Sequence, residues 1–280
     1  PKFALCLHGF PECSTSWRYQ MPLLAEMGYT VWAPNLRGYG GTSRPGRVRD
    51  YRIRHLVDDV AGLIDAAGAD RTLLMAHDWG GAIAWLFALA EIRPLERFIV
   101  MNLPHPLLFR RGLRTLKQLR RSWYIFFFQL PWLPEAVLGA NGARRVSGMI
   151  RGSASRKERF PGEVLEVYRK NADQPGAIRA MLAYYRAYIR NGVDKDLARA
   201  AFSKLETPTL MIWGLEDKAL GRDTTDGTAD HVRDLTLRFL PDVSHWVQQE
   251  APETVNAMLL AWLADEPVPE ATEVSWTRLA

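Results

Sequence analysis

The sequence predicts an α/β protein built on a mostly parallel, doubly wound sheet with an inserted all-helical segment. Short apolar runs of strand length alternate with longer helical patterns. The runs are almost continuously apolar, which is typical of parallel strands covered on both faces. The alternation stops in the middle of the chain and then resumes. With 280 residues, 48% of them hydrophobic, the chain can bury one large core that carries an insertion.

Six apolar runs are the expected strands, and helical patterns lie between them and after the last one. The expected strands are residues 3–7, 30–33, 72–76, 98–102, 209–213 and 235–240. The expected helices of this part are residues 56–67, 81–90 and 254–263. Strands and helices in this order are typical of a sheet with helices packed on both faces.

The middle of the chain has no convincing buried strand. It is aromatic, basic and helical in pattern, and helices are expected at residues 163–170 and 177–190. We interpret residues 103–202 as a helical cap inserted into the sheet domain. Residues 1–102 and 203–280 then form the two parts of that domain.

The net charge of +5 is modest, but basic residues greatly outnumber acidic ones between Arg110 and Arg159. Such a surface can attract nucleic acid or anionic lipid. No nucleic-acid-binding motif accompanies the charge, so solvated helix faces are favoured. The nearest approach to a membrane span, residues 123–133, is short and interrupted by Pro131. We therefore expect no nucleic acid partner. Membrane association through the aromatic, basic cap is a disfavoured alternative, and a homodimer is compatible with the sequence.

Two cysteines, Cys6 and Cys13, argue against a disulfide scaffold and fit a reducing compartment. The cytoplasm is the expected location. The chain opens almost directly on a strand, so we also expect that residues upstream of Pro1 are missing from this sequence.

The stretch AHDWGG, residues 76–81, indicates a catalytic turn. A turn of this pattern between a strand and a helix normally presents a serine in hydrolases, but here the central residue is Asp78. The positive end of the helix dipole favours an anion at this place. Taken alone, the motif fits equally well an Asp that only caps the helix.

A carboxylate nucleophile attacks saturated carbon and forms an ester, which a histidine-activated water must then cleave. His245 follows the last expected strand, and Asp217 follows the strand before it, so that nucleophile, acid and histidine come in the order expected of a hydrolase sheet. Glu216 and Asp223 are rival acids. Asp217 is preferred because it stands close to the end of its strand, three residues past Gly214.

The motif HGFPE, residues 8–12, directly follows the first expected strand. Its glycine permits a sharp turn, and the Phe10–Pro11 bond is a candidate for a cis peptide. The backbone N–H groups of Phe10 and Trp79 are expected to form an oxyanion hole for the intermediate of ester hydrolysis.

Together these motifs resemble the epoxide hydrolases of the α/β-hydrolase fold, and the resemblance covers essentially the whole chain. The motifs that carry it are HGFPE, WRYQMP (17–22), NLRGYGGTSRP (35–45), HDWGG and SHW (244–246). Haloalkane dehalogenases share the Asp nucleophile and much of HDWGG, but they commonly have Asn at the position of Phe10. The sequence departs from the family at Ala76, where Gly is usual, and at Asn35, where Asp is usual.

The resemblance also implies two cap tyrosines that hold the epoxide oxygen. The run YIFFFQLP places Tyr124 in one of these roles, and MLAYYRAY places Tyr185 in the other, with Tyr184 as the neighbour that can be confused with it. Phenols can hydrogen-bond the oxygen and protonate it as the ring opens. Aromatic residues on helices are more often core, and that is the competing interpretation.

The predicted function is the addition of water to a small apolar epoxide, giving a vicinal diol through an ester at Asp78, with no metal or organic cofactor. Two alternatives remain: a haloalkane-type dehalogenase with the same nucleophile, and a non-catalytic binding protein on this scaffold. Expected substrate-binding residues are Trp17, His77 and Trp246, and Trp123 and Phe127 are further candidates for an apolar pocket wall.

Overall fold

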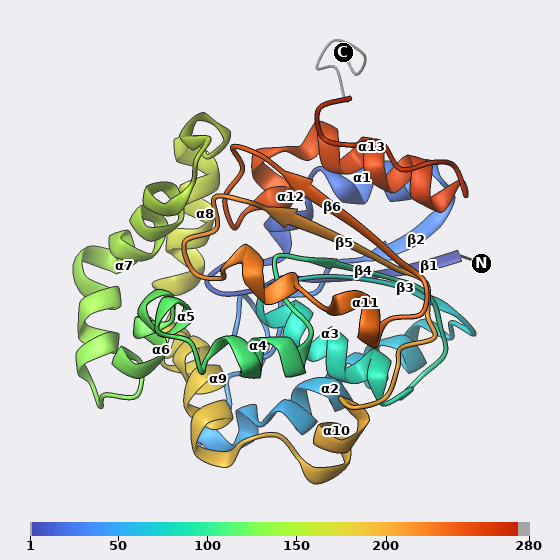
Figure 1. Cartoon of the computed structure of the whole chain (residues 1–280). Coiled ribbons are helices and arrows are strands. Elements are labelled where there is room, and N and C mark those ends of the chain that lie inside the picture. The colour runs from blue at the N-terminus through green and yellow to red at the C-terminus, as the bar shows by residue number, and fades with distance from the viewer. Residues whose placement is uncertain (1, 274–280) are drawn as a thin grey trace.

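The computed structural model describes residues 2–273, and its centre is a sheet of six parallel strands in the order β2-β1-β3-β4-β5-β6 (Figure 1). The strands are β1 (Lys2–Leu7), β2 (Tyr29–Trp32), β3 (Thr72–His77), β4 (Leu95–Met101), β5 (Thr209–Gly214) and β6 (Leu235–Leu240). Every expected strand is present, with small shifts at the ends. The α/β prediction is therefore confirmed, and the described sheet is parallel throughout.

The helices comprise all five expected ones and several that the sequence patterns did not resolve. They are α1 (Gln20–Glu26), α2 (Ile53–Ala67), α3 (Trp79–Leu89), α4 (Pro106–Gly112), α5 (Leu116–Arg121), α6 (Trp123–Phe127), α7 (Leu133–Ser153), α8 (Gly162–Ala172), α9 (Ala177–Asn191), α10 (Lys195–Ala200), α11 (Thr228–His231), α12 (Val247–Glu250) and α13 (Pro252–Leu263). Residues 140–143 are not helical, so α7 consists of two pieces joined at a kink.

The two faces of the sheet are covered by different helices, because successive side chains of a strand point to opposite sides. Phe3, Leu5 and Leu7 of β1 pack in one buried cluster together with residues of α2 and α3. Ala4 and Cys6 pack in the other cluster, with residues of α1 and α13. Figure 1 shows these two helix layers on either side of the strands. Burial on both faces explains why the inner strands β1, β3 and β5 are almost continuously apolar.

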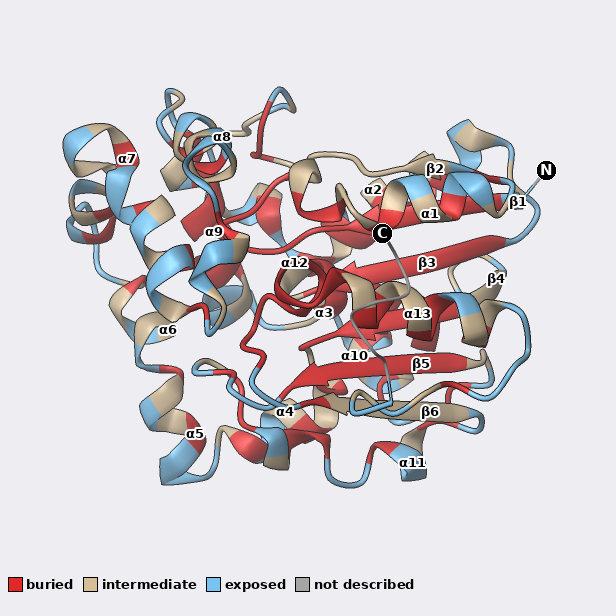
Figure 2. Ribbon diagram, turned by 90° about the horizontal axis from the view of Figure 1, so that it is seen from above, coloured by how far each residue is buried: buried red, intermediate tan, exposed pale blue. Residues whose placement is uncertain are grey.

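The segment between β4 and β5 contains α4 to α10 and no strand. Figure 2 shows α6 to α9 beyond the carboxyl ends of the strands, which is the edge where parallel sheets carry their sites. Helix α9 contributes to the same buried cluster as the sheet. That residues 103–202 form a separate cap remains a prediction. Within residues 2–273, no helix is both long enough and apolar enough to span a bilayer.

Candidate active site

Asp78 stands on the sharp connection between β3 and α3, where its backbone adopts φ 49° and ψ −123°. Such a conformation is unfavourable for most residues and places the side chain at the carboxyl edge of the sheet. The turn needs glycines around it. A Cβ on Gly9 would lie 2.3 Å from the Cβ of Asp78, and one on Gly80 would lie 2.2 Å from the carbonyl oxygen of Leu7.

The backbone of Phe10, in the loop after β1, binds the carboxylate of Asp78. Its N–H donates a hydrogen bond to Oδ1 of Asp78 over 2.7 Å. The Phe10–Pro11 peptide is cis, as the sequence indicates. Trp79 is the first residue of α3, so its N–H lies at the helix end next to the carboxylate. The oxyanion hole of Phe10 and Trp79 remains a prediction, and this arrangement supports it.

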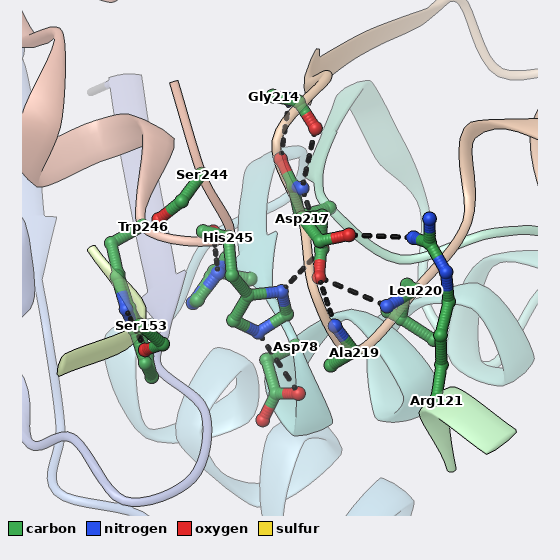
Figure 3. A network of polar contacts seen from close by, with 12 residues as sticks. Asp78, Arg121, Ser153, Gly214, Asp217, Ala219, Leu220, Ser244, His245 and Trp246 are labelled. Atoms are coloured by element: carbon green, nitrogen blue, oxygen red, sulfur yellow. Dashed lines mark hydrogen bonds and ion pairs between the residues drawn. The ribbon is translucent and has the colours of Figure 1, made fainter. Parts of the chain in front are cut away.

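His245 lies between two carboxylates, one just after β3 and one in the loop after β5 (Figure 3). Its Nδ1 is 2.6 Å from Oδ2 of Asp217, and its Nε2 is 3.4 Å from Oδ2 of Asp78. The rival acid Asp223 instead pairs with Lys117 at the surface. The structure therefore brings Asp78, Asp217 and His245 together as the sequence order suggests.

Asp217 is fixed by four hydrogen bonds. The N–H groups of Ala219 and Leu220 donate to its Oδ1, and the amide of Asn102 donates to its Oδ2 over 2.8 Å, alongside His245. Asn102 follows the end of β4. No sequence pattern indicated that Asn102 orients Asp217.

For each of the three residues, burial and neighbouring charge shift the pKa in opposite directions. Burial alone would lower the pKa of His245, but Asp217 and Asp78 raise it well above its ordinary value of 6.5. Burial would raise the pKa of Asp78 and Asp217, yet the hydrogen bond and charge of His245 hold both below 3.8. These pKa directions favour an imidazolium between two carboxylates in the resting site.

The raised pKa of His245 predicts a pH-dependent stability that His245→Gln should remove. The proton on His245 stabilises the folded state fully below about pH 6.5, and this contribution is lost as pH rises through the higher folded pKa. In that window the wild-type unfolding free energy should fall, relative to the variant, by about 1.4 kcal/mol per pH unit. Urea unfolding of both proteins at neutral and mildly alkaline pH measures it. Parallel curves would show that His245 rests neutral.

A cavity of about 940 Å³, including its open mouth, lies over Asp78. Among the described residues on its wall, Asp78 is the only one with an acidic or basic side chain. Tyr124 of α6 and Tyr185 of α9 line the cavity, with ring centres 5.9 Å apart. Tyr188 lines it as well, although no sequence pattern indicated this residue. The wall is otherwise apolar, which suits an apolar ligand.

The two adjacent tyrosines of α9 have different surroundings: Tyr185 lines the cavity and Tyr184 does not. Tyr184 is fully buried, and its hydroxyl donates to the carbonyl oxygen of Arg37 over 2.7 Å, away from the cavity. Burial, with the charge of Asp78 as a further cause, raises the pKa of both Tyr124 and Tyr185 above the usual range. Both phenols therefore keep their protons at neutral pH and can act as donors.

The predicted substrate-binding role of Trp17 is wrong. Trp17 is fully buried and packs with α1 and α13 on the far side of the sheet from the cavity. The two further aromatic candidates are also absent from the cavity wall, which receives Ile125 and Phe126 from their segment.

His77 and Trp246 likewise do not line the cavity. His77 is fully buried; its Nε2–H donates to the carbonyl oxygen of His245, and its Nδ1 is 2.8 Å from Glu12. The indole of Trp246 donates to the hydroxyl of Ser153, pointing away from Asp78 (Figure 3). These two residues support the backbone around His245 rather than a ligand.

The turn that carries Asp217 is also held from α5, which the sequence did not reveal. The amide of Gln118 donates to Ser122 Oγ and to the carbonyl oxygen of Ala219, and it accepts from the N–H of Gly221. Arg121 donates to the carbonyl oxygen of Asp217 (Figure 3). Within residues 2–273, no three His, Cys, Asp or Glu side chains are grouped so that they could hold a metal ion.

A parallel sheet with a carboxylate at the nucleophile turn, a histidine and a second acid defines the class of α/β hydrolases. The sequence matches the alpha/beta hydrolase fold family over residues 5–252, so the chain belongs to that family and is a hydrolase. It is 38% identical to the "AB hydrolase superfamily protein YfhM" of Bacillus subtilis, over 93% of this chain and 89% of that one.

Among its curated relatives and structural neighbours are epoxide hydrolases. It is 34% identical to human epoxide hydrolase 4, over 94% of this chain and 72% of that one. It is 32% identical to epoxide hydrolase A of Mycobacterium tuberculosis, over 91% of this chain and 88% of that one. The crystal structure of Bacillus megaterium epoxide hydrolase with an inhibitor superposes with a TM-score of 0.85 and 29% identity, over 94% of both chains.

Proposed function

We propose that the protein is an epoxide hydrolase that converts an apolar epoxide and water to a vicinal diol. One observation carries the proposal: among the described residues, the wall of an apolar cavity holds a single carboxylate, Asp78, together with the phenols of Tyr124 and Tyr185. A carboxylate can attack a ring carbon, and the phenols can hold and protonate the ring oxygen. The epoxide hydrolases among the relatives support the same reaction.

In the first step an oxygen of Asp78 bonds to a ring carbon while the ring C–O bond breaks. The released oxygen takes a proton from Tyr124 or Tyr185, and the tyrosinate recovers one from His245, directly or through water. This proton transfer from His245 is favourable, because the Asp78 ester no longer carries the negative charge that helps to keep His245 protonated. Ester formation thereby leaves His245 neutral and ready to act as a base.

In the second step His245 takes a proton from a water molecule, and the hydroxide attacks the carboxyl carbon of the Asp78 ester. The N–H groups of Phe10 and Trp79 receive the oxyanion. When the tetrahedral intermediate collapses, the bond between the carboxyl carbon of Asp78 and the alkoxy oxygen breaks, and His245 protonates that oxygen as the diol leaves. The free Asp78 then returns its proton to His245. Asp217 orients the imidazole throughout.

Product analysis with a panel of aryl and alkyl epoxides, with a bromoalkane alongside, tests the proposed reaction. Diol formation that depends on the protein is the expected result. Bromide release without diol would assign the protein to the dehalogenases, which need the nucleophile but not the tyrosines. Ligand binding without either product would favour the non-catalytic alternative.

Tyr185→Phe is expected to slow ester formation by about 100-fold, because one of two proton donors to the leaving oxygen is lost. Tyr184→Phe is a matched control on the same helix: it removes a buried hydrogen bond to Arg37, costs about 1 kcal/mol of stability and leaves the rate almost unchanged. Stopped-flow single-turnover rates separate the two. Equal losses in both variants would show that Tyr185 acts only through packing.

A further inference from the structure

Exposed apolar side chains are concentrated on one part of the molecule, residues 116–133. Six of the eleven large apolar side chains that are exposed within residues 2–273 lie there: Leu116, Trp123, Phe126, Leu130, Trp132 and Leu133. Trp123 is 63% exposed and Trp132 is 82% exposed. Figure 2 shows exposed residues along α5 and α6. Apolar patches of this kind mark interaction sites.

The same stretch is strongly basic. Between Arg110 and Leu133 the sequence contains six basic residues and no acidic one: Arg110, Arg111, Arg114, Lys117, Arg120 and Arg121. From other segments, Asp223 pairs with Lys117, and Arg111 donates to the backbone carbonyl of Asp226. Arg110, Arg114 and Arg120 are exposed. Residues 110–133, called here the cationic aromatic surface, therefore combine positive charge with exposed tryptophans.

The backbone conformation of Trp132 indicates that exposure of its indole is built into the fold. Trp132 lies between Pro131 and Leu133 with φ 58°, a left-handed conformation that is unfavourable for a bulky residue. In the isolated chain the strain is not offset by burial of the side chain, which stays in water. Residues held in strained backbone conformations cluster at functional sites such as ligand clamps.

The cationic aromatic surface continues into the cavity. Phe126 is 55% exposed and also lines the cavity above Asp78. Phe109, Leu113 and Ile125, which precede or lie within the surface, line it too. An apolar route therefore leads from the outside of the surface to the carboxylate.

We propose that the cationic aromatic surface docks on an anionic lipid bilayer. Exposed Trp, Phe and Leu side chains enter the boundary between headgroups and acyl chains, and the exposed Arg110, Arg114 and Arg120 complement anionic headgroups. The sequence alone favours solvated helix faces here, and the exposed tryptophans in their midst change that interpretation. The docking does not depend on the reaction; delivery of lipid-dissolved epoxides past Phe126 rests on the proposed function.

Sedimentation of the full chain with vesicles tests the docking directly. We expect binding to vesicles that contain phosphatidylglycerol, little binding to pure phosphatidylcholine, and release at about 0.5 M salt. Combined Arg110→Gln, Arg114→Gln and Arg120→Gln should weaken binding by about 100-fold. Combined Trp123→Ser and Trp132→Ser should weaken it by about 10-fold or more.

Phe202→Ser is the matched control, because Phe202 is exposed but lies outside the surface. All variants should hydrolyse a water-soluble substrate as the wild type does, since none of the changed residues lines the cavity. Wild-type protein that fails to bind anionic vesicles would overturn the proposal. A tryptophan variant that turns a dimer into a monomer, with vesicle binding unchanged, would identify a protein interface instead and equally overturn it.

Discussion

Asp78→Asn is expected to abolish turnover, with a loss of about 10⁵-fold or more in kcat, while the fold stays intact. The amide has the shape of the carboxylate and tolerates the positive φ of the turn. It can still accept the hydrogen bond of the Phe10 N–H. It lacks the charge and nucleophilicity needed to open a ring. Steady-state diol formation measures the effect, and circular dichroism checks the fold.

Asp223→Asn provides the control, because this acid also follows β5 but pairs with Lys117 at the surface. It should retain nearly full activity. The intact mass of the Asp78→Asn protein must be verified after the assay, because water activated by His245 could hydrolyse the introduced amide. If the variant with its amide intact keeps more than about 1% of the activity, water attacks the substrate without an ester at Asp78.

His245→Gln is expected to trap the covalent intermediate. Ester formation uses Asp78 and the tyrosines and needs no general base, whereas hydrolysis needs water activated by the imidazole. Turnover should fall by about 10⁴-fold, and one equivalent of epoxide should be consumed in a burst. Mass spectrometry of the digested protein should show the peptide with Asp78 heavier by the mass of one substrate molecule.

Two comparisons make the trapping experiment decisive. Asp217→Asn should slow hydrolysis in the same direction, since the imidazole loses its orienting carboxylate. The double variant with Asp78→Asn should show neither burst nor added mass. Slow steady turnover of the single His245 variant without added mass would contradict a covalent step at Asp78.

The sheet and the positions of the three central residues could be predicted from the sequence for a simple physical reason. Strands buried on both faces are apolar along their length, so their ends are visible in the sequence. The carboxyl ends of parallel strands lie at one edge of a sheet. Residues just beyond β3, β5 and β6 therefore had to meet, and Asp78, Asp217 and His245 do so.

The side-chain directions could not be predicted in the same way. His77 precedes Asp78 by one residue, yet it is directed to Glu12 and the backbone of His245 because it ends the strand. Tyr184 and Tyr185 are about 100° apart on their helix, and only packing decides which one faces the cavity. An apolar residue such as Trp17 can pack on either face of the sheet, and the sequence around it does not show which face it joins.

The amide of Gln118 links two parts of the molecule that have different tasks in the proposed reaction. It donates to Ser122, the residue just before α6, and α6 carries Tyr124. It also bonds the backbone of Ala219 and Gly221 in the turn that carries Asp217. Lifting α5 away would leave buried polar groups without partners, at a cost of about 1 to 3 kcal/mol for each. Helix α5 therefore holds both the cavity wall with Tyr124 and the turn with Asp217, which orients His245. Displacement of α5 would disturb the geometry that both steps of the proposed reaction need.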